Sequence, residues 1–153
     1  MTTFYTLDRA NVRLGELTPV LEALRQQRLE VIALRDRLAQ ARREQGAVAG
    51  GRGTAGSPEA RSEPGAAAGA AGETPRVLAL RIQGTIDRMQ GGVTRLDEWS
   101  IQLRDIETGL VDFPALVSGR AVWLCWRLGE AEVAWWHELS AGVAGRRPIA
   151  ELA

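Results

Sequence analysis

One stretch of this sequence offers a folded core almost nothing to bury, and it divides the chain in two. Residues 46–74 read GAVAGGRGTAGSPEARSEPGAAAGAAGET, in which Val48 is the only large apolar residue. Such a segment cannot offset its ordering entropy by burying side chains. We therefore expect a disordered Gly/Ala-rich linker over residues 46–74, with the folded structure built from the residues on either side.

The segment before the linker has the pattern of a helical arm, over residues 1–45. Its apolar side chains recur every three or four residues, at Leu7, Ala10, Leu14, Leu17, Leu21 and Leu24. This spacing is a heptad-like seam. Thr6 is a predicted N-cap, and Thr18-Pro19 is a second helix-start signal. The sequence allows either a short helix over 7–16 followed by a long one over 19–44, or one kinked helix.

A second helical arm is predicted over residues 75–99. Thr74-Pro75 repeats the pairing of a capping threonine with proline at the first helical position. The apolar stripe that follows consists of Ala79, Ile82, Ile86, Met89, Val93 and Leu96. Two amphipathic helices of matched length with a loop between them are expected to pack antiparallel, as a coiled-coil-like hairpin.

From residue 100 the apolar period changes from helical spacing to alternation. The segments IQLRDI, LVDFPAL, AVWLCWRL and EVAWWHEL are separated by turns that contain glycine. This pattern predicts three or four short strands in a small antiparallel sheet, followed by a loop-like tail. The predicted fold class is therefore α+β: a long antiparallel helical hairpin with a small, tryptophan-rich antiparallel β-sheet over residues 100–153.

The segment 123–139, WLCWRLGEAEVAWWHEL, concentrates the rarest side chains of the chain. It holds four of the five tryptophans, the only cysteine and the only histidine. A two- or four-residue turn at Gly129-Glu130 would place Val122, Leu124, Trp126, Leu128, Val133, Trp135 and His137 on one face of a hairpin. The opposite face would then carry Trp123, Cys125, Arg127, Ala134, Trp136 and Glu138. A three- or five-residue loop would swap these partnerships.

Each of these two faces has a structural and a functional interpretation. On the first, His137 is expected to be a core histidine packed towards the helices. On the second, Arg127 and Glu138 would form a cross-strand ion pair, with arginine stacked on tryptophan. The functional alternative for the second face is a shallow aromatic groove with a charged anchor, suited to a partner segment or a small acidic ligand.

The residue types favour a few positions as a ligand or interaction site. Asp112 is a carboxylate within an apolar strand, and the Arg146-Arg147 pair precedes Pro148. The candidate residues are Asp112, Trp123, Arg127, Trp136, His137, Glu138, Arg146 and Arg147. With one histidine, no HExxH motif and no paired cysteines, we predict no metal and no cofactor. Cys125 is predicted to be buried and unreactive.

Composition removes several classes of function. The chain has 19 basic and 19 acidic residues and no lysine. A net charge of zero argues against nucleic-acid binding, and the absence of lysine excludes Schiff-base and phosphate-loop lysines. One cysteine allows no internal disulfide. Because the start lacks a signal-peptide pattern and the apolar runs are too short to span a bilayer, we expect a cytoplasmic protein with no membrane contact.

Four motifs resemble those of the domain of unknown function 2203 family, a group of small prokaryotic proteins without an established activity. They are FYTLDRAN at the start, GLVDFPAL at 109–116, VWLCWRLGEAEVAWWHEL at 122–139 and GVAGRRP at 142–148. The resemblance covers both ends of the chain and skips the linker. It implies no catalytic residues, but it makes Asp112, Arg127, His137 and Glu138 the motif positions to test.

Two classes of function remain after these exclusions. The favoured one is non-enzymatic: the helical hairpin or the aromatic sheet face associates with a second copy or with another protein. The alternative is a small-ligand or metal-dependent site on the sheet, formed by His137, Glu138, Arg127 and Asp112. The sequence identifies neither the partner nor the ligand.

Overall fold

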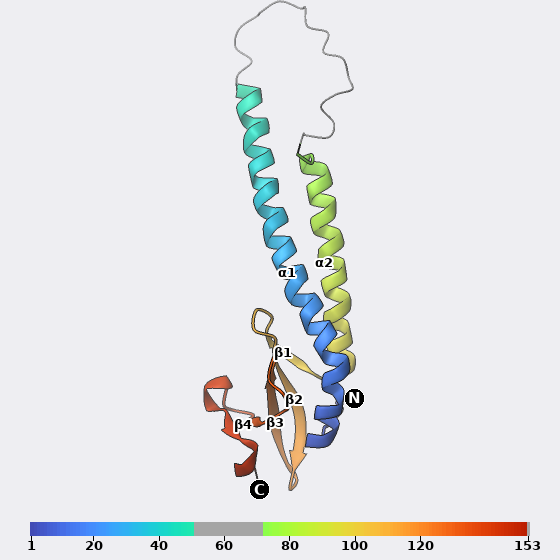
Figure 1. Cartoon of the computed structure of the whole chain (residues 1–153), viewed down its shortest axis with the longest axis vertical. Helices are drawn as coiled ribbons and strands as arrows, with labels where there is room; N and C mark the ends of the chain where they lie inside the picture. The colour runs from blue at the N-terminus through green and yellow to red at the C-terminus, as the bar shows by residue number, and fades with distance from the viewer. Residues whose placement is uncertain (51–71, 153) are drawn as a thin grey trace, which may run out of the picture. The chain divides into compact units, whose positions relative to one another are not determined.

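A computed structural model describes residues 1–50 and 72–152 of the chain. Two helices, α1 (Leu7–Gly50) and α2 (Pro75–Glu98), precede the strands (Figure 1). The strands are β1 (Gln102–Asp105), β2 (Leu110–Val117), β3 (Arg120–Arg127), β4 (Trp135–Glu138) and β5 (Arg147–Pro148). Single-turn 3₁₀ helices, η1 (Val143–Gly145) and η2 (Ile149–Glu151), flank β5. The α+β class, with two antiparallel helices and an antiparallel sheet, confirms the prediction.

Helix α1 is one continuous helix. It begins as predicted, because the Arg9 N–H donates to the Thr6 hydroxyl at 3.2 Å. The two-helix alternative is wrong, since Pro19 lies inside α1. Proline removes one backbone donor from a helix, but the Thr18 hydroxyl donates to the Leu14 carbonyl at 2.7 Å within the same turn. The predicted linker over 46–74 lies mostly outside the described residues, and its first five residues continue α1.

Helix α2 also begins where the sequence predicts. The Val77 N–H donates to the Thr74 hydroxyl at 3.3 Å, and Pro75 is the first helical residue. The predicted stripe is wrong at one position, because Ala79 is exposed and the larger Leu78 is buried beside it. Among the described residues, neither helix is long and apolar enough to cross a membrane.

The described residues form two compact units. The first contains residues 1–29 and 87–153, and the second contains residues 30–86. In the second unit Val31, Leu34 and Leu78 are buried. In the same unit, the carboxylate of Glu73, which precedes α2, forms ion pairs with Arg37 on α1 and Arg81 on α2.

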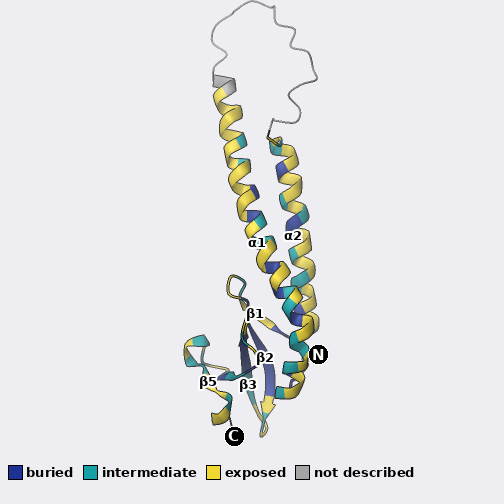
Figure 2. Cartoon of the chain, viewed as in Figure 1, coloured by how far each residue is buried: buried dark blue, intermediate teal, exposed yellow. Residues whose placement is uncertain are grey.

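The first unit contains the sheet, with strand order β1-β2-β3-β4-β5. Side chains on one face of the sheet pack against the first turns of α1 and the last turns of α2. Figure 2 shows buried positions on β2 and β3 and on the part of α1 nearest the sheet. This core comprises Tyr5, Ala10, Leu17, Leu21, Leu24, Leu96, Ile101, Val111, Phe113, Ala115, Val122, Leu124, Trp126, Val133 and Trp136. The predicted seam of α1 is therefore the surface that covers the sheet.

The pairing of β3 with β4 has the swapped register. Cys125 lies opposite Trp135, and Trp123 lies opposite His137. The loop between the strands covers residues 128–134, an odd number, so the assignment of His137 and Trp135 to the helix-covered face is wrong. Contacts to other parts of the chain hold this loop. Among them, the Trp126 indole N–H donates to the Glu130 carbonyl at 3.1 Å, and the Val133 N–H donates to the Asn11 side chain at 2.7 Å.

Glycine is required at the turn between β1 and β2. Gly109 has φ +69°, and a Cβ there would lie 2.5 Å from the Leu128 Cβ. Gly119, in the two-residue turn between β2 and β3, has a similar φ of +77°, but a Cβ there would meet open space. Both backbones lie in the left-handed region that L-residues avoid.

Substitutions at these two glycines distinguish the cost of backbone strain from the cost of steric overlap. We expect Gly119→Ala to lower the free energy of unfolding by about 1–2 kcal/mol, from the left-handed conformation alone. Gly109→Ala should cost about 1–3 kcal/mol more, because the new methyl group also overpacks against Leu128. Denaturant unfolding of both variants checks this, and equal losses would contradict the described approach of Gly109 to Leu128.

Candidate functional site

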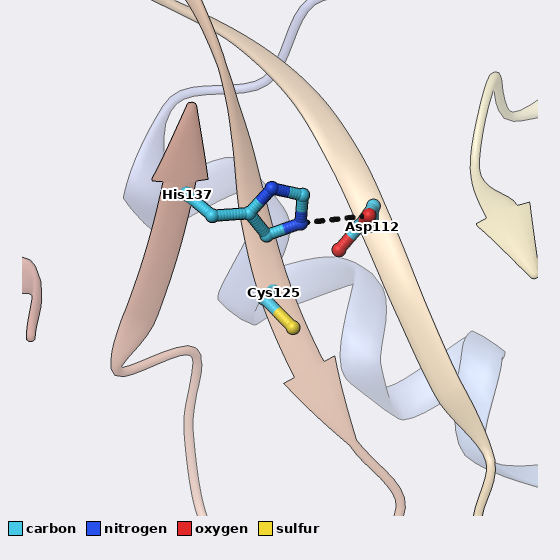
Figure 3. Close-up of side chains that lie close together, drawn as sticks. All are labelled: Asp112, Cys125 and His137. Carbon is cyan, nitrogen blue, oxygen red and sulfur yellow. Dashed lines mark hydrogen bonds and ion pairs between the residues drawn. The ribbon is translucent and has the colours of Figure 1, made fainter. Parts of the chain in front are cut away.

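Three buried polar side chains from neighbouring strands meet on the sheet face opposite the helices. Asp112 lies on β2 directly opposite Cys125 on β3, and His137 lies on β4 next to them (Figure 3). One carboxylate oxygen, the Sγ atom and one imidazole nitrogen lie within 4.8 Å of one another. Each of the three residues is at most 3% exposed. We call these residues the Asp–Cys–His cluster.

Asp112 is a buried carboxylate with one satisfied oxygen and one unsatisfied oxygen. Its Oδ2 accepts hydrogen bonds from Arg104 Nε at 2.8 Å and from His137 Nε2 at 2.9 Å. Its Oδ1 is buried and has no hydrogen-bond partner among the described residues. Because buried polar atoms are almost always hydrogen-bonded, this oxygen is an exception that calls for an explanation.

Arg104 reaches Asp112 from an irregular position in β1. The register shifts between Leu103 and Asp105, so Arg104 is the extra residue of a β-bulge. Bulges redirect side chains and recur beside functional sites. The guanidinium of Arg104 also lies 5.0 Å from the centre of the Trp123 ring.

The imidazole of His137 has an oxygen at each ring nitrogen. Nδ1 lies 2.9 Å from the backbone carbonyl oxygen of Glu138, and Nε2 lies 2.9 Å from Asp112 Oδ2. Both contacts are hydrogen bonds at once only when both nitrogens carry protons. The Nδ1–H to carbonyl bond fixes the ring so that Nε2 points at the cluster.

Cys125 is held as a protonated thiol in the metal-free cluster. Burial, followed by the negative charge of Asp112, raises the pKa of its thiol from 9.0 to about 12. The positive charge of Arg146 acts in the opposite direction and only partly offsets these effects. A thiol with such a pKa is a poor nucleophile near neutral pH.

Arg146 joins the cluster to the loop between β3 and β4. Its guanidinium donates to the Glu130 carboxylate at 2.8 Å and lies 5.0 Å from the centre of the Trp135 ring. Its Nε is buried and has no partner among the described residues. A thiolate at Cys125 would be an acceptor beside this guanidinium.

A pocket of about 280 Å³ lies over the cluster. Asp112, His137, Arg104 and Trp123 line it. The remaining lining comes from residues 139–143, which follow β4. The cluster therefore has a route to small molecules although its own side chains are buried.

Four of the predicted site residues gather at this cluster. Asp112 and His137 belong to it, Trp123 lines the pocket, and Arg146 lies beside Cys125. The prediction of His137 as a core histidine packed towards the helices is wrong, because it lies on the opposite face of the sheet and contacts the Asp112 carboxylate. Asp112 and His137, two of the residues proposed from the sequence as a site, contact each other at 2.9 Å; their role as a site stays a prediction.

The other four predicted residues lie elsewhere. Glu138 points to the opposite face and forms an ion pair with Arg120 at 3.3 Å, so the predicted Arg127–Glu138 pair is wrong. Arg127 is exposed at the end of β3, opposite Leu110. Trp136 is a core residue, and Arg147 on β5 lies 5.6 Å from the centre of its ring. The swapped register accounts for Trp136 and Glu138, because it exchanges the faces of β4.

Sequence reasoning missed two members of the arrangement. Cys125 was predicted to be buried, which is confirmed, but without a role in a site. Arg104 was not singled out at all. Its signal is weak, because an arginine in a short alternating segment is typical of an exposed strand, and the sequence does not show that Arg104 lies beside Asp112 on the neighbouring strand.

These features define an α+β protein whose small antiparallel sheet is covered by helices on one face and carries a buried Asp–Cys–His cluster on the other. The chain belongs to the family described as uncharacterized conserved protein (DUF2203), whose family model matches residues 3–149. This match confirms the resemblance predicted from the terminal motifs. No curated protein and no solved structure matches the chain.

The raised pKa of Cys125 makes the thiol's reactivity a test of the site geometry. In metal-free folded protein we expect iodoacetamide to react about 1,000-fold more slowly than in the unfolded chain near neutral pH, because a pKa of about 12 instead of 9.0 lowers the thiolate fraction by that factor. Intact-mass spectrometry measures the reaction without ambiguity, since Cys125 is the only cysteine. Folded and unfolded rates within tenfold of each other would contradict the described burial.

Proposed function

We propose that this protein binds a divalent transition metal, with zinc the ion that suits it best, through Asp112, Cys125 and His137. One observation carries the proposal. A carboxylate, a thiol and an imidazole converge within 4.8 Å in the interior of a sheet. Thiolate, imidazole and carboxylate are the three side-chain ligands that zinc takes in proteins.

The charges of the cluster support a divalent ion. Metal binding would deprotonate Cys125, as ligation does for thiols generally. Asp112 and the Cys125 thiolate would then carry two negative charges against the two positive charges of the ion. The thiolate would also accept a hydrogen bond from Arg146, and Asp112 Oδ1 would gain the partner that it lacks.

The surroundings of the three ligands resemble the outer shell of metal sites. Ligating histidines usually donate their second N–H to a carbonyl or carboxylate, and His137 Nδ1 lies 2.9 Å from the Glu138 carbonyl oxygen. Ligating carboxylates are themselves hydrogen-bonded, and Arg104 donates to Asp112 Oδ2. The metal would take the place of the proton on His137 Nε2.

The spacing of the ligand atoms fits a metal after a small contraction. With bonds of about 2.0–2.3 Å, tetrahedral zinc holds its ligand atoms about 3.3–3.8 Å apart. The three atoms here lie within 4.8 Å of one another, so closure requires movements of about 1 Å. Rotation of the Asp112 and Cys125 side chains supplies a movement of that size without a change in the strands.

Three protein ligands leave one tetrahedral position for an external group. In zinc proteins, structural sites fill all four positions with protein ligands, whereas sites that act on ligands keep one open. The pocket over Asp112 and His137 lies where that position would face. We therefore propose a ligand-accessible metal site rather than a purely structural one.

This proposal departs from the sequence prediction of no metal. That prediction rested on the absence of local ligand motifs, whereas these ligands come one from each of three strands. The association with a second copy or a protein partner predicted from the sequence stays a prediction. It does not compete with a metal on the sheet face opposite the helices.

Cobalt(II) is the direct probe of this site. Added to metal-free protein, it should bind one ion per chain with a thiolate-to-cobalt charge-transfer band in the near ultraviolet, and zinc should displace it. That band reports Cys125 alone, because the chain has no other cysteine. Cys125→Ser should abolish the band, and Asp112→Asn or His137→Asn should weaken binding by more than about 100-fold, beyond the effect of losing an outer-shell partner.

Asp97→Asn is the matched control for the loss of a carboxylate, because Asp97 is exposed on α2. This variant should bind cobalt like the original protein. Absence of a charge-transfer band in folded protein, or an unchanged band in Cys125→Ser, would refute the metal site. In either case the cluster would be a structural network of Arg104, Asp112 and His137.

Metal binding should also raise stability. An ion that binds only the folded state stabilises it by about 4 kcal/mol at a free concentration 1,000 times its Kd. We expect zinc to raise the melting temperature of the original protein and of Asp97→Asn, and to leave that of His137→Asn nearly unchanged. Thermal unfolding with buffered zinc and with a chelator measures the difference, and an equal rise in His137→Asn would locate the binding elsewhere.

A further inference from the structure

We infer that the pocket over the Asp–Cys–His cluster binds a small organic carboxylate, whose carboxylate group contacts both Arg104 and the metal. This inference rests on the proposed metal site and specifies what occupies its open position. It is carried by the charge of the pocket, the placement of Arg104, and the small size and partly apolar lining of the pocket.

The charge of the loaded pocket favours an anion. Asp112 is the only acidic side chain among the residues that line it. The negative charges of Asp112 and of a Cys125 thiolate would be balanced by a divalent ion, and Arg146 is balanced by Glu130. The positive charge of Arg104 would then have no counter-charge, and an anionic ligand supplies it.

Arg104 is placed to receive a planar oxyanion. Within the described part of the chain only its Nε is hydrogen-bonded, to Asp112, which leaves the two terminal nitrogens for a ligand. Its guanidinium carbon lies 5.0 Å from the centre of the Trp123 ring, and its side chain is 39% exposed, so solvent reaches it. A guanidinium fork matches the two oxygens of a carboxylate in a bidentate contact.

The lining limits the rest of the ligand. The pocket of about 280 Å³ is at the lower end for ligand sites. Trp123, Leu139 and Val143 contribute apolar walls. A monocarboxylate with a short apolar or aromatic substituent meets all three conditions: one charge, one planar oxyanion and a small apolar body.

Benzoate and benzamide test the inference, because they share a shape and differ in charge. The protein is first loaded with cobalt(II), and the thiolate-to-cobalt band is recorded before either compound is added. Benzoate should then shift the visible cobalt bands in a saturable manner with one site per chain. Benzamide at the same concentrations should leave the bands unchanged.

Variants at Arg104 identify the second contact. Arg104→Gln should weaken benzoate binding to the cobalt-loaded protein by at least about tenfold, because a charge-assisted bidentate contact is lost. Arg104→Lys keeps the positive charge but loses the planar guanidinium. Its affinity for benzoate should lie between that of the original protein and that of Arg104→Gln. Both comparisons use only variants whose thiolate-to-cobalt band is intact.

The outcomes distinguish this inference from the metal site on which it rests. A missing thiolate-to-cobalt band before benzoate is added overturns the metal site itself. An intact band with no benzoate response, or with equal responses to benzoate and benzamide, overturns the carboxylate ligand and leaves the metal site standing. An unchanged benzoate affinity in Arg104→Gln overturns the role of Arg104.

Discussion

A negative charge in the interior of a sheet has to be stabilised by its neighbours, and Asp112 imposes that requirement on the strands around it. Burial of an ionised carboxylate without partners is among the largest costs in a folded protein. Arg104 from β1 and His137 from β4 supply the partners, so the Asp112 carboxylate on β2 links strand β1 to strand β4. The remaining oxygen has no hydrogen-bond partner among the described residues.

The helices were predictable because their determinants are local. Caps at Thr6 and Thr74, proline at the first helical position, and an apolar seam are short-range signals that the structure reproduces. Pro19 shows the limit of such signals. It reads as a helix start, but the helix continues through it, and Leu17 and Leu21 on the flanking turns pack into the core.

Which side chains of β4 face Asp112 depends on whether the loop before β4 has an odd or an even number of residues. Local sequence does not determine this number. A shift of the β3–β4 register by one residue would place His137 on the helix-covered face and separate it from Asp112. The register is held partly by Asn11, which bonds Val133 from the beginning of the chain. Alternation within each strand was therefore predictable, whereas the choice of facing residues, and with it the gathering of Asp112, Cys125 and His137, required contacts between distant segments.

The bulge at Arg104 has a consequence for the margin of the sheet as well as for the site. An open edge strand presents a row of unpaired backbone groups on which a foreign strand can assemble. Here one edge, β1, has only four residues and an interrupted ladder, and the other, β5, has two residues, one of them Pro148. The interrupted ladder of β1 and the shortness of β5 thus discourage growth of the sheet into aggregates.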